Sequence, residues 1–190
     1  MIVSFEQMLE KAKQGEPMVL AGAAAQDVDT IKAMAAAEEA GMIRPVLVGD
    51  IPTIERVMKE EGVTFRNAEL VQADDMVEAC AKAVELVRLG KADFLMKGLV
   101  DTNIFLKAIL NKETGLPVHG LLSHVMTFDT LGAYHKLMIT SDGGMVLYPT
   151  LEQKIGLIKN CLPVAKALEI ENPKVAVLCA CLLYTSDAAD

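Results

Sequence analysis

The chain has 190 residues, of which 52% are hydrophobic and 23% are charged. This composition is typical of a folded globular protein and argues against disorder. The formal net charge is −8, and no Lys/Arg-rich stripe interrupts the acidity, so nucleic acid is not an expected partner.

Membrane insertion and export are not expected either. No apolar run approaches the roughly 20 residues that cross a bilayer, and the first residues are charged throughout, unlike a signal peptide. The four Cys residues show neither disulfide nor metal-ligand spacing. We therefore expect a cytoplasmic protein with reduced thiols.

Short apolar runs alternate with longer segments of helical periodicity along the whole chain. Helices are predicted after Ser4, after Asp27 or Asp29, and over residues 51–61, 75–89, 102–110 and 150–168. Strands are predicted at residues 18–23, 45–50, 68–71, 93–96, 120–127, 136–140 and 174–179. This alternation predicts an α/β fold with a parallel sheet covered by helices on both faces.

The segment FLMKGLVDT, residues 94–102, is the strongest local candidate for a binding site. Open α/β sheets bind ligands outside the carboxyl ends of their strands. Lys97 supplies a positive charge there, Gly98 permits close approach of the backbone, and Thr102 places a hydroxyl beside the free N–H groups of a helix start. This combination suits a phosphate, although an ordinary turn would have the same residues.

Two later segments place polar residues at the ends of apolar runs. One contains Ser123 and His124, whose side chains should point to opposite faces of a strand, so that they form no nucleophile–base pair. His124 is interpreted as a structural residue. The other segment, ITSDGG, contains Thr140 and Asp142 and reads by itself as a tight turn. Neither GxGxxG nor GxxxxGK[ST] occurs, and the remaining His residues lack metal-ligand spacing, so no nucleotide motif and no metal site are predicted.

Three long segments, in this order, resemble the phosphate acetyl- and butyryltransferase family, and in particular its butyryltransferase branch. They are MKGLVDTNIFLKAILNKETGL, LLSHVMTFDT and MITSDGGMVLYPTLEQKIGLIKN. The resemblance covers residues 1 to about 180. It implies transfer of an acyl group between coenzyme A and inorganic phosphate, with coenzyme A as a substrate and no cofactor.

The resemblance also implies a fold and an assembly. Family members have a two-domain fold like that of isocitrate and isopropylmalate dehydrogenases and form homo-oligomers. Residues 1–125 would supply most of the first domain, and residues 126–180 would begin the second. A nicotinamide-dependent dehydrogenase would share this fold, but it has no motif support here.

Substrate-binding residues follow from the same resemblance. Lys97, Gly98 and Thr102 would line the cleft, with Ser123, Thr140 and Asp142 on adjacent strand ends. Lys107 stands where relatives commonly carry Arg. A lysine has the same positive charge as an arginine but cannot make the bidentate contact of a guanidinium to a phosphate. The catalytic residues are expected in a later serine- and arginine-containing segment of the family, which residues 1–190 do not match.

The last ten residues, CLLYTSDAAD (181–190), resemble a translated sequencing adaptor. We therefore expect the N-terminal part of a longer enzyme. This part should be inactive alone and prone to association through an exposed edge at residues 174–179. Two alternatives remain open from the sequence: a phosphate acetyltransferase, and a non-catalytic ligand-binding remnant.

Overall fold

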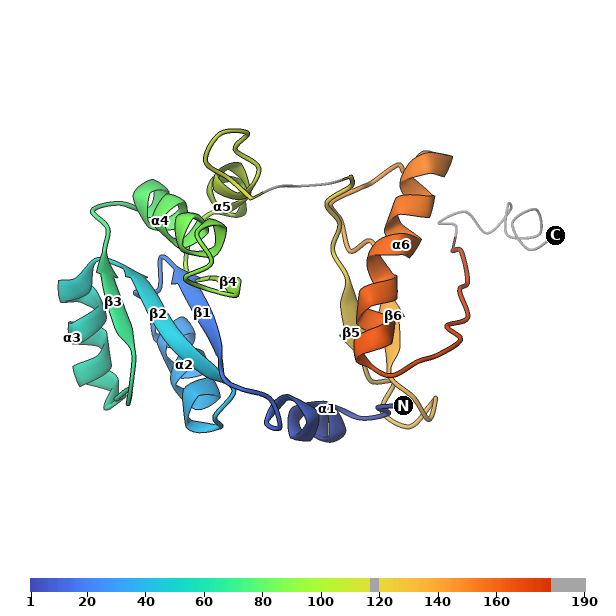
Figure 1. The fold of residues 1–190 in the computed structure, drawn as a ribbon, viewed down its shortest axis with the longest axis horizontal. Helices are drawn as coiled ribbons and strands as arrows, with labels where there is room; N and C mark the ends of the chain where they lie inside the picture. Colours follow the sequence, from blue (N-terminus) through green and yellow to red (C-terminus); the bar gives the residue numbers. More distant parts are fainter. Residues whose placement is uncertain (117–119, 179–190) are drawn as a thin grey trace. The chain divides into compact units, whose positions relative to one another are not determined.

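The computed structural model describes residues 1–116 and 120–178 (Figure 1). The chain divides into two compact units. One, here called the parallel-sheet unit, contains Leu9–His119; the other, here called the hairpin unit, contains Met1–Met8 together with the chain from Gly120 onward. The domain assignment made from the resemblance stays a prediction, and its last segment, residues 181–190, lies outside the described residues.

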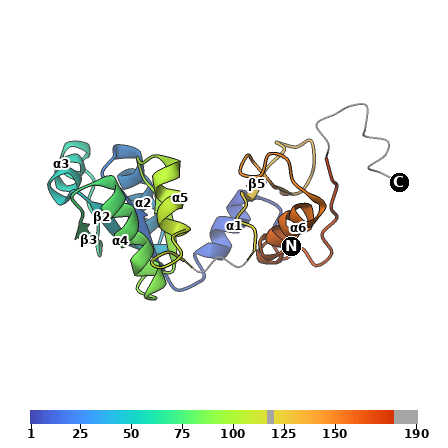
Figure 2. The ribbon, with the colours of Figure 1, turned by 90° about the horizontal axis from the view of Figure 1, so that it is seen from above.

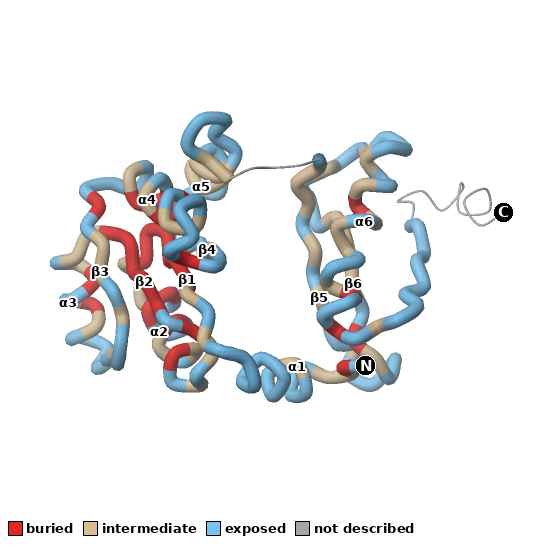
Figure 3. Tube along the Cα trace, viewed as in Figure 1, coloured by how far each residue is buried: buried red, intermediate tan, exposed pale blue. Residues whose placement is uncertain are grey.

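The parallel-sheet unit is built on four parallel strands in the order β3-β2-β1-β4. They are β1 (Met18–Ala23), β2 (Ile43–Gly49), β3 (Glu69–Gln72) and β4 (Phe94–Lys97). The two central strands are the most buried elements (Figure 3). The predicted parallel α/β architecture is thereby confirmed.

Helices cover both faces of this sheet because successive strand residues point to opposite sides. On one face, Leu20 and Leu47 pack with residues of α2 (Val28–Glu39) and α3 (Ile51–Glu61). On the other face, Ala21 and Val46 pack with residues of α4 (Met76–Arg88), and α5 (Thr102–Ile109) lies beside α4 (Figure 2).

All four of these helices begin at an aspartate, and the caps of α2, α3 and α4 share one geometry. Asp27, Asp50 and Asp75 cap α2, α3 and α4, and each accepts a hydrogen bond from a backbone N–H three residues on, at 3.0, 3.0 and 2.8 Å. Such a cap satisfies one of the otherwise unpaired N–H groups of the first turn. Of the two aspartates that the sequence offered as caps of α2, the structure uses Asp27.

The hairpin unit is smaller. Its strands β5 (Met126–Phe128) and β6 (Met138–Thr140) are antiparallel, and α6 (Leu151–Ala167) contacts β6. Helix α6 begins with a capping box between Thr150 and Gln153.

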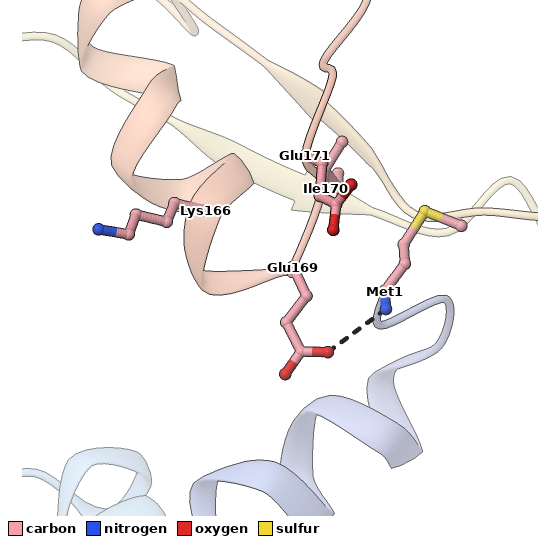
Figure 4. A pocket seen from close by; sticks show the side chains of 5 residues that line it. All are labelled: Met1, Lys166, Glu169, Ile170 and Glu171. Carbon is pink, nitrogen blue, oxygen red and sulfur yellow. Dashed lines mark hydrogen bonds and ion pairs between the residues drawn. The ribbon is translucent and has the colours of Figure 1, made fainter.

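The chain start is tied to the end of α6. The N–H of Ile2 donates to the carbonyl oxygen of Leu168 at 2.9 Å, and the Met1 ammonium lies 3.3 Å from Oε2 of Glu169 (Figure 4). Ile2 and Leu168 are both buried, and with Leu137 they form the core of this unit. Helix α1 (Phe5–Ala12) follows, with the Ser4 hydroxyl accepting from the N–H of Gln7 as predicted for a cap.

Three predicted strands are wrong or shortened in the hairpin unit, and of these the strand predicted over residues 136–140 begins only at Met138. The strand predicted over residues 120–127 reduces to Met126–Phe128, and residues 174–178 form no strand, while residue 179 of that segment lies outside the described residues. A strand needs a neighbour to pair with, and among the described residues the sheet of this unit has two strands.

Candidate functional site

The carboxyl ends of β1 and β4 form a topological switch point. From β1 the chain proceeds outward to β2 and β3, and it then returns to place β4 on the other side of β1. Ala23 and Lys97, near the ends of the two strands, are register partners. The loops that leave β1 and β4 therefore diverge from adjacent points, the place where open α/β sheets bind ligands.

Gly98 allows these two loops to pack directly against each other. Its N–H donates to the carbonyl oxygen of Ala23 at 2.9 Å. A Cβ at position 98 would overlap the carbonyl oxygen of Ala24 and lie 2.9 Å from that of Ala23. The close approach that the sequence suggested at Gly98 is thus made by the chain's own neighbouring loop.

Lys97 is the cation at this switch point. Its side chain is exposed, and its ammonium donates to the carbonyl oxygens of Gly98 (3.2 Å) and Val100 (2.9 Å). An ammonium has three N–H donors, so these two bonds fix its position and leave a third donor for a ligand. Lys97 also acts on the buried Cys80 thiol: burial raises the pKa of Cys80, and the Lys97 charge opposes this in part.

The start of α5 lies directly after this loop. Asp101 caps the helix and accepts from the N–H of Asn103 at 2.7 Å, and Thr102 is the exposed first residue. Lys107 is five residues further, about 7.5 Å along the axis, in the last turn of α5. The structure thus groups Lys97, Gly98 and Thr102 and sets Lys107 apart, where its charge complements the helix dipole.

The other predicted residues, Ser123, Thr140 and Asp142, belong to the hairpin unit. The Ser123 hydroxyl accepts from Nδ2 of Asn160 at 2.8 Å, and the same nitrogen donates to the carbonyl oxygen of Leu121 at 2.8 Å. Thr140 ends β6. Asn160 lies on α6, 37 residues from Ser123, and sequence reasoning missed it because no local pattern marks a bond of that separation.

Asp142 organises the turn after β6. Its Oδ1 accepts from the N–H groups of Gly144 (2.7 Å) and Met145 (2.8 Å). Burial raises the pKa of this carboxyl, but the surrounding backbone N–H groups outweigh burial and the pKa is lowered overall. Asp142 is therefore a carboxylate at neutral pH, and its bonds give it a structural role in the tight turn.

His124 packs against the same turn, which also contains two buried polar atoms. A Cβ at Gly143 would lie 3.1 Å from Cε1 of His124, so the ring covers the glycine. This contact fits the structural role expected for His124. Ser141 Oγ and Asp142 Oδ2 are buried without a hydrogen-bond partner in the described part of the chain.

The described residues contain neither a metal centre nor a membrane span. Among residues 1–116 and 120–178, no group of three or more His, Cys, Asp or Glu side chains is placed to hold a metal ion. None of the helices within these ranges is long and apolar enough to cross a membrane.

Comparison with known proteins decides the family. A family model described as "Phosphate acetyl/butaryl transferase" matches residues 57–189. The chain belongs to this family. The matched region includes β3, β4 and the switch-point loop with Lys97, as well as the turn with Asp142.

Individual relatives agree with this assignment. The chain is 41% identical to the phosphate butyryltransferase of Clostridium acetobutylicum over 180 residues, which is 95% of this chain and 60% of that protein. It is 35% identical to the phosphate acetyltransferase of Thermotoga maritima, over 91% of this chain and 58% of that protein. The chain therefore spans about three-fifths of the length of the curated relatives that it matches.

A solved structure shows the same fold. The structure of a branched-chain phosphotransacylase from Enterococcus faecalis V583 superposes with a TM-score of 0.68 at 24% identity, over 86% of this chain and 56% of that one. At this identity the likeness concerns the fold alone.

Proposed function

We propose that the protein containing this chain transfers a butyryl-type acyl group between coenzyme A and inorganic phosphate. The proposal rests on the position of Lys97, which lies at the carboxyl end of β4 beside the start of α5. The chain that carries this lysine belongs to the family named above. The higher identity to a butyryltransferase (41%) than to an acetyltransferase (35%) favours the butyryl substrate.

In the proposed reaction, a phosphate oxygen attacks the thioester carbonyl of acyl-CoA. A carbon–oxygen bond forms, the carbon–sulfur bond breaks, and the thiolate of coenzyme A leaves. The task of the protein is to hold two anionic substrates in line and to stabilise the charge that develops on the carbonyl oxygen. The third N–H of Lys97 and the N–H groups at the start of α5 are suited to bind phosphate oxygens.

Several further properties belong to this proposal. We propose that the reaction needs no cofactor or metal, that the full-length protein is a cytoplasmic homo-oligomer, and that it binds neither nucleic acid nor membrane. Ser123, Thr140, Asp142 and Lys107 are proposed to contribute to substrate binding, and Asp142 would do so as a turn-forming residue rather than as a direct anion ligand.

A chimera provides the test. Residues 1–180 of this chain replace the matched region of the Clostridium acetobutylicum phosphate butyryltransferase, and the product is assayed with butyryl-CoA, acetyl-CoA and phosphate. We expect turnover with butyryl-CoA to exceed turnover with acetyl-CoA; the reverse order would favour the acetyltransferase alternative. The 190-residue chain is assayed in parallel, for which the sequence-based expectation is no turnover.

Matched lysine variants connect the activity to the switch point. In the chimera, Lys97→Ala should raise the KM for phosphate about tenfold or more, as expected for loss of one charged hydrogen bond of about 1.5–3 kcal/mol. Lys112→Ala removes another exposed lysine, outside this loop, and should leave the KM unchanged. A folded chimera that binds phosphate without turnover would favour the ligand-binding alternative.

A further inference from the structure

Asp27 differs from Asp50 and Asp75, the aspartates that cap α3 and α4, by a hydrogen bond to the loop after β4. The hydrogen bonds of Asp50 and Asp75 to the first turns of α3 and α4 are local. Asp27 makes the same local bond, from the N–H of Thr30 to Oδ1 at 3.0 Å, and its Oδ2 accepts from the N–H of Leu99 at 3.1 Å. This second bond joins residues 72 positions apart and connects the loop after β1 to the loop after β4.

The loop after β4 is anchored on either side of Leu99, by the bond from the Gly98 N–H to the carbonyl oxygen of Ala23 (2.9 Å) and by the buried side chain of Val100. The side chain of Leu99 is 68% exposed, so packing does not hold it. The carbonyl groups on either side of Leu99, those of Gly98 and Val100, are the two acceptors of the Lys97 ammonium. The Leu99 N–H and the Gly98 carbonyl belong to one planar peptide group, so the bond to Asp27 fixes the direction of that carbonyl. The Val100 carbonyl follows two peptide groups further along the same loop, and the two acceptors together set where the Lys97 charge lies.

We propose that Asp27 is a positioning residue, which fixes the loop of residues 98–101 and thereby places the Lys97 ammonium at the switch point. The consequence for activity rests on the proposed function, whereas the structural part does not. Asp27 acts through the loop: its two oxygens accept from N–H groups, and within residues 1–116 and 120–178 its carboxylate makes no hydrogen bond or ion pair with Lys97 itself.

The charge state of Asp27 fits this role. Burial raises the pKa of its carboxyl, but hydrogen bonds from Thr30 and from the N–H of Leu99 outweigh burial, and the pKa is lowered overall. The side chain is thus a carboxylate at neutral pH. A hydrogen bond to a charged acceptor is stronger than one between neutral groups, so the bond to Leu99 is suited to hold an exposed loop.

Asp27→Asn is the most direct test because asparagine remains a good helix cap but cannot offer a second oxygen to Leu99. In the 190-residue chain, hydrogen exchange of the Leu99 amide should accelerate about tenfold, as expected for loss of a bond of about 1.4 kcal/mol. Asp75→Asn is the matched control, because it alters the same kind of cap on α4 and should leave Leu99 unaffected. Asp27→Ser, which caps but is too short to reach Leu99, should repeat the result. Unchanged exchange in both Asp27 variants would overturn the proposal.

The kinetic consequence is measured in the chimera described above. Asp27→Asn should raise the KM for phosphate several-fold with a smaller change in kcat, while Asp75→Asn should change neither. Faster exchange at Leu99 with unaltered kinetics would overturn the link to Lys97 and leave the proposed function standing. A chimera that is inactive with every wild-type residue in place would count against the proposed function, and the exchange result would still decide whether Asp27 holds the loop.

Discussion

The two units of the chain use similar apolar segments with different results. In the parallel-sheet unit, β1 and β2 each have a strand on both sides and helices on both faces, and their central residues are fully buried. In its described part, the hairpin unit has two strands in its sheet and a core cluster of three buried residues, while Leu131, Leu147 and Tyr148 are among its most exposed side chains. The number of neighbouring elements, rather than the hydrophobicity of a segment, decides how much of it is buried.

Truncation of one leucine in each core gives the largest expected effect. Leu47 is 0% exposed in the centre of β2, and Leu137 is 4% exposed in the hairpin unit. Leu47→Ala should destabilise the parallel-sheet unit by the upper part of the range of about 2–5 kcal/mol for such changes. Leu137→Ala should cost less, because a small core has fewer contacts to lose and can relax around the missing atoms.

Urea unfolding separates the two outcomes. The chain has no Trp, and its three Tyr residues all follow residue 119, so tyrosine fluorescence reports on the part of the chain that follows Gly120. Far-UV circular dichroism follows the helices of both units. Equal losses of stability for the two variants would contradict the difference in burial between the units.

A glycine at the switch point gives the next largest effect. Gly98→Ala places a methyl group against the backbone oxygens of Ala23 and Ala24, and such overpacking costs about 1–3 kcal/mol. Gly15→Ala is the control, because its Cβ would make an ordinary contact at 3.7 Å. We expect a lower urea midpoint, followed by circular dichroism, for Gly98→Ala alone. A stability equal to that of the control would mean that the two loops can move apart freely.

How well the sequence predicted the structure follows the same division. The helix predicted over residues 51–61 has those bounds in the structure, because Asp50 and Gly62 mark its two ends locally. The strand predicted over residues 18–23 also has those bounds, because a continuous apolar run marks it. In the hairpin unit, the apolar run at residues 120–127 predicted a longer strand than the one observed. Its neighbours, not its composition, determine whether it pairs.

The candidate site shows the same limit. Lys97 and Gly98 could be placed at the carboxyl end of a strand because local patterning marks strand ends. The bond between Asp27 and Leu99, and that between Asn160 and Ser123, join residues 72 and 37 positions apart. A single sequence contains no local signal for such bonds, so Asp27 could be predicted as a cap but not as the anchor of a second loop.

The smallest expected effect is a gain in the weaker unit. Gly156 lies inside α6, and a Cβ there would meet the Leu121 side chain at 3.4 Å, an ordinary contact. Replacing an interior helical glycine by alanine stabilises by about 0.5–1 kcal/mol, so Gly156→Ala should raise the urea midpoint measured by tyrosine fluorescence. Gly144→Ala serves as its opposite, since a φ of +134° strains any residue with a side chain, and it should lower that midpoint. If Gly156→Ala instead destabilised the chain, α6 would be packed against Leu121 as tightly as the switch-point loops are packed against each other. The two units would then differ in size and not in packing density.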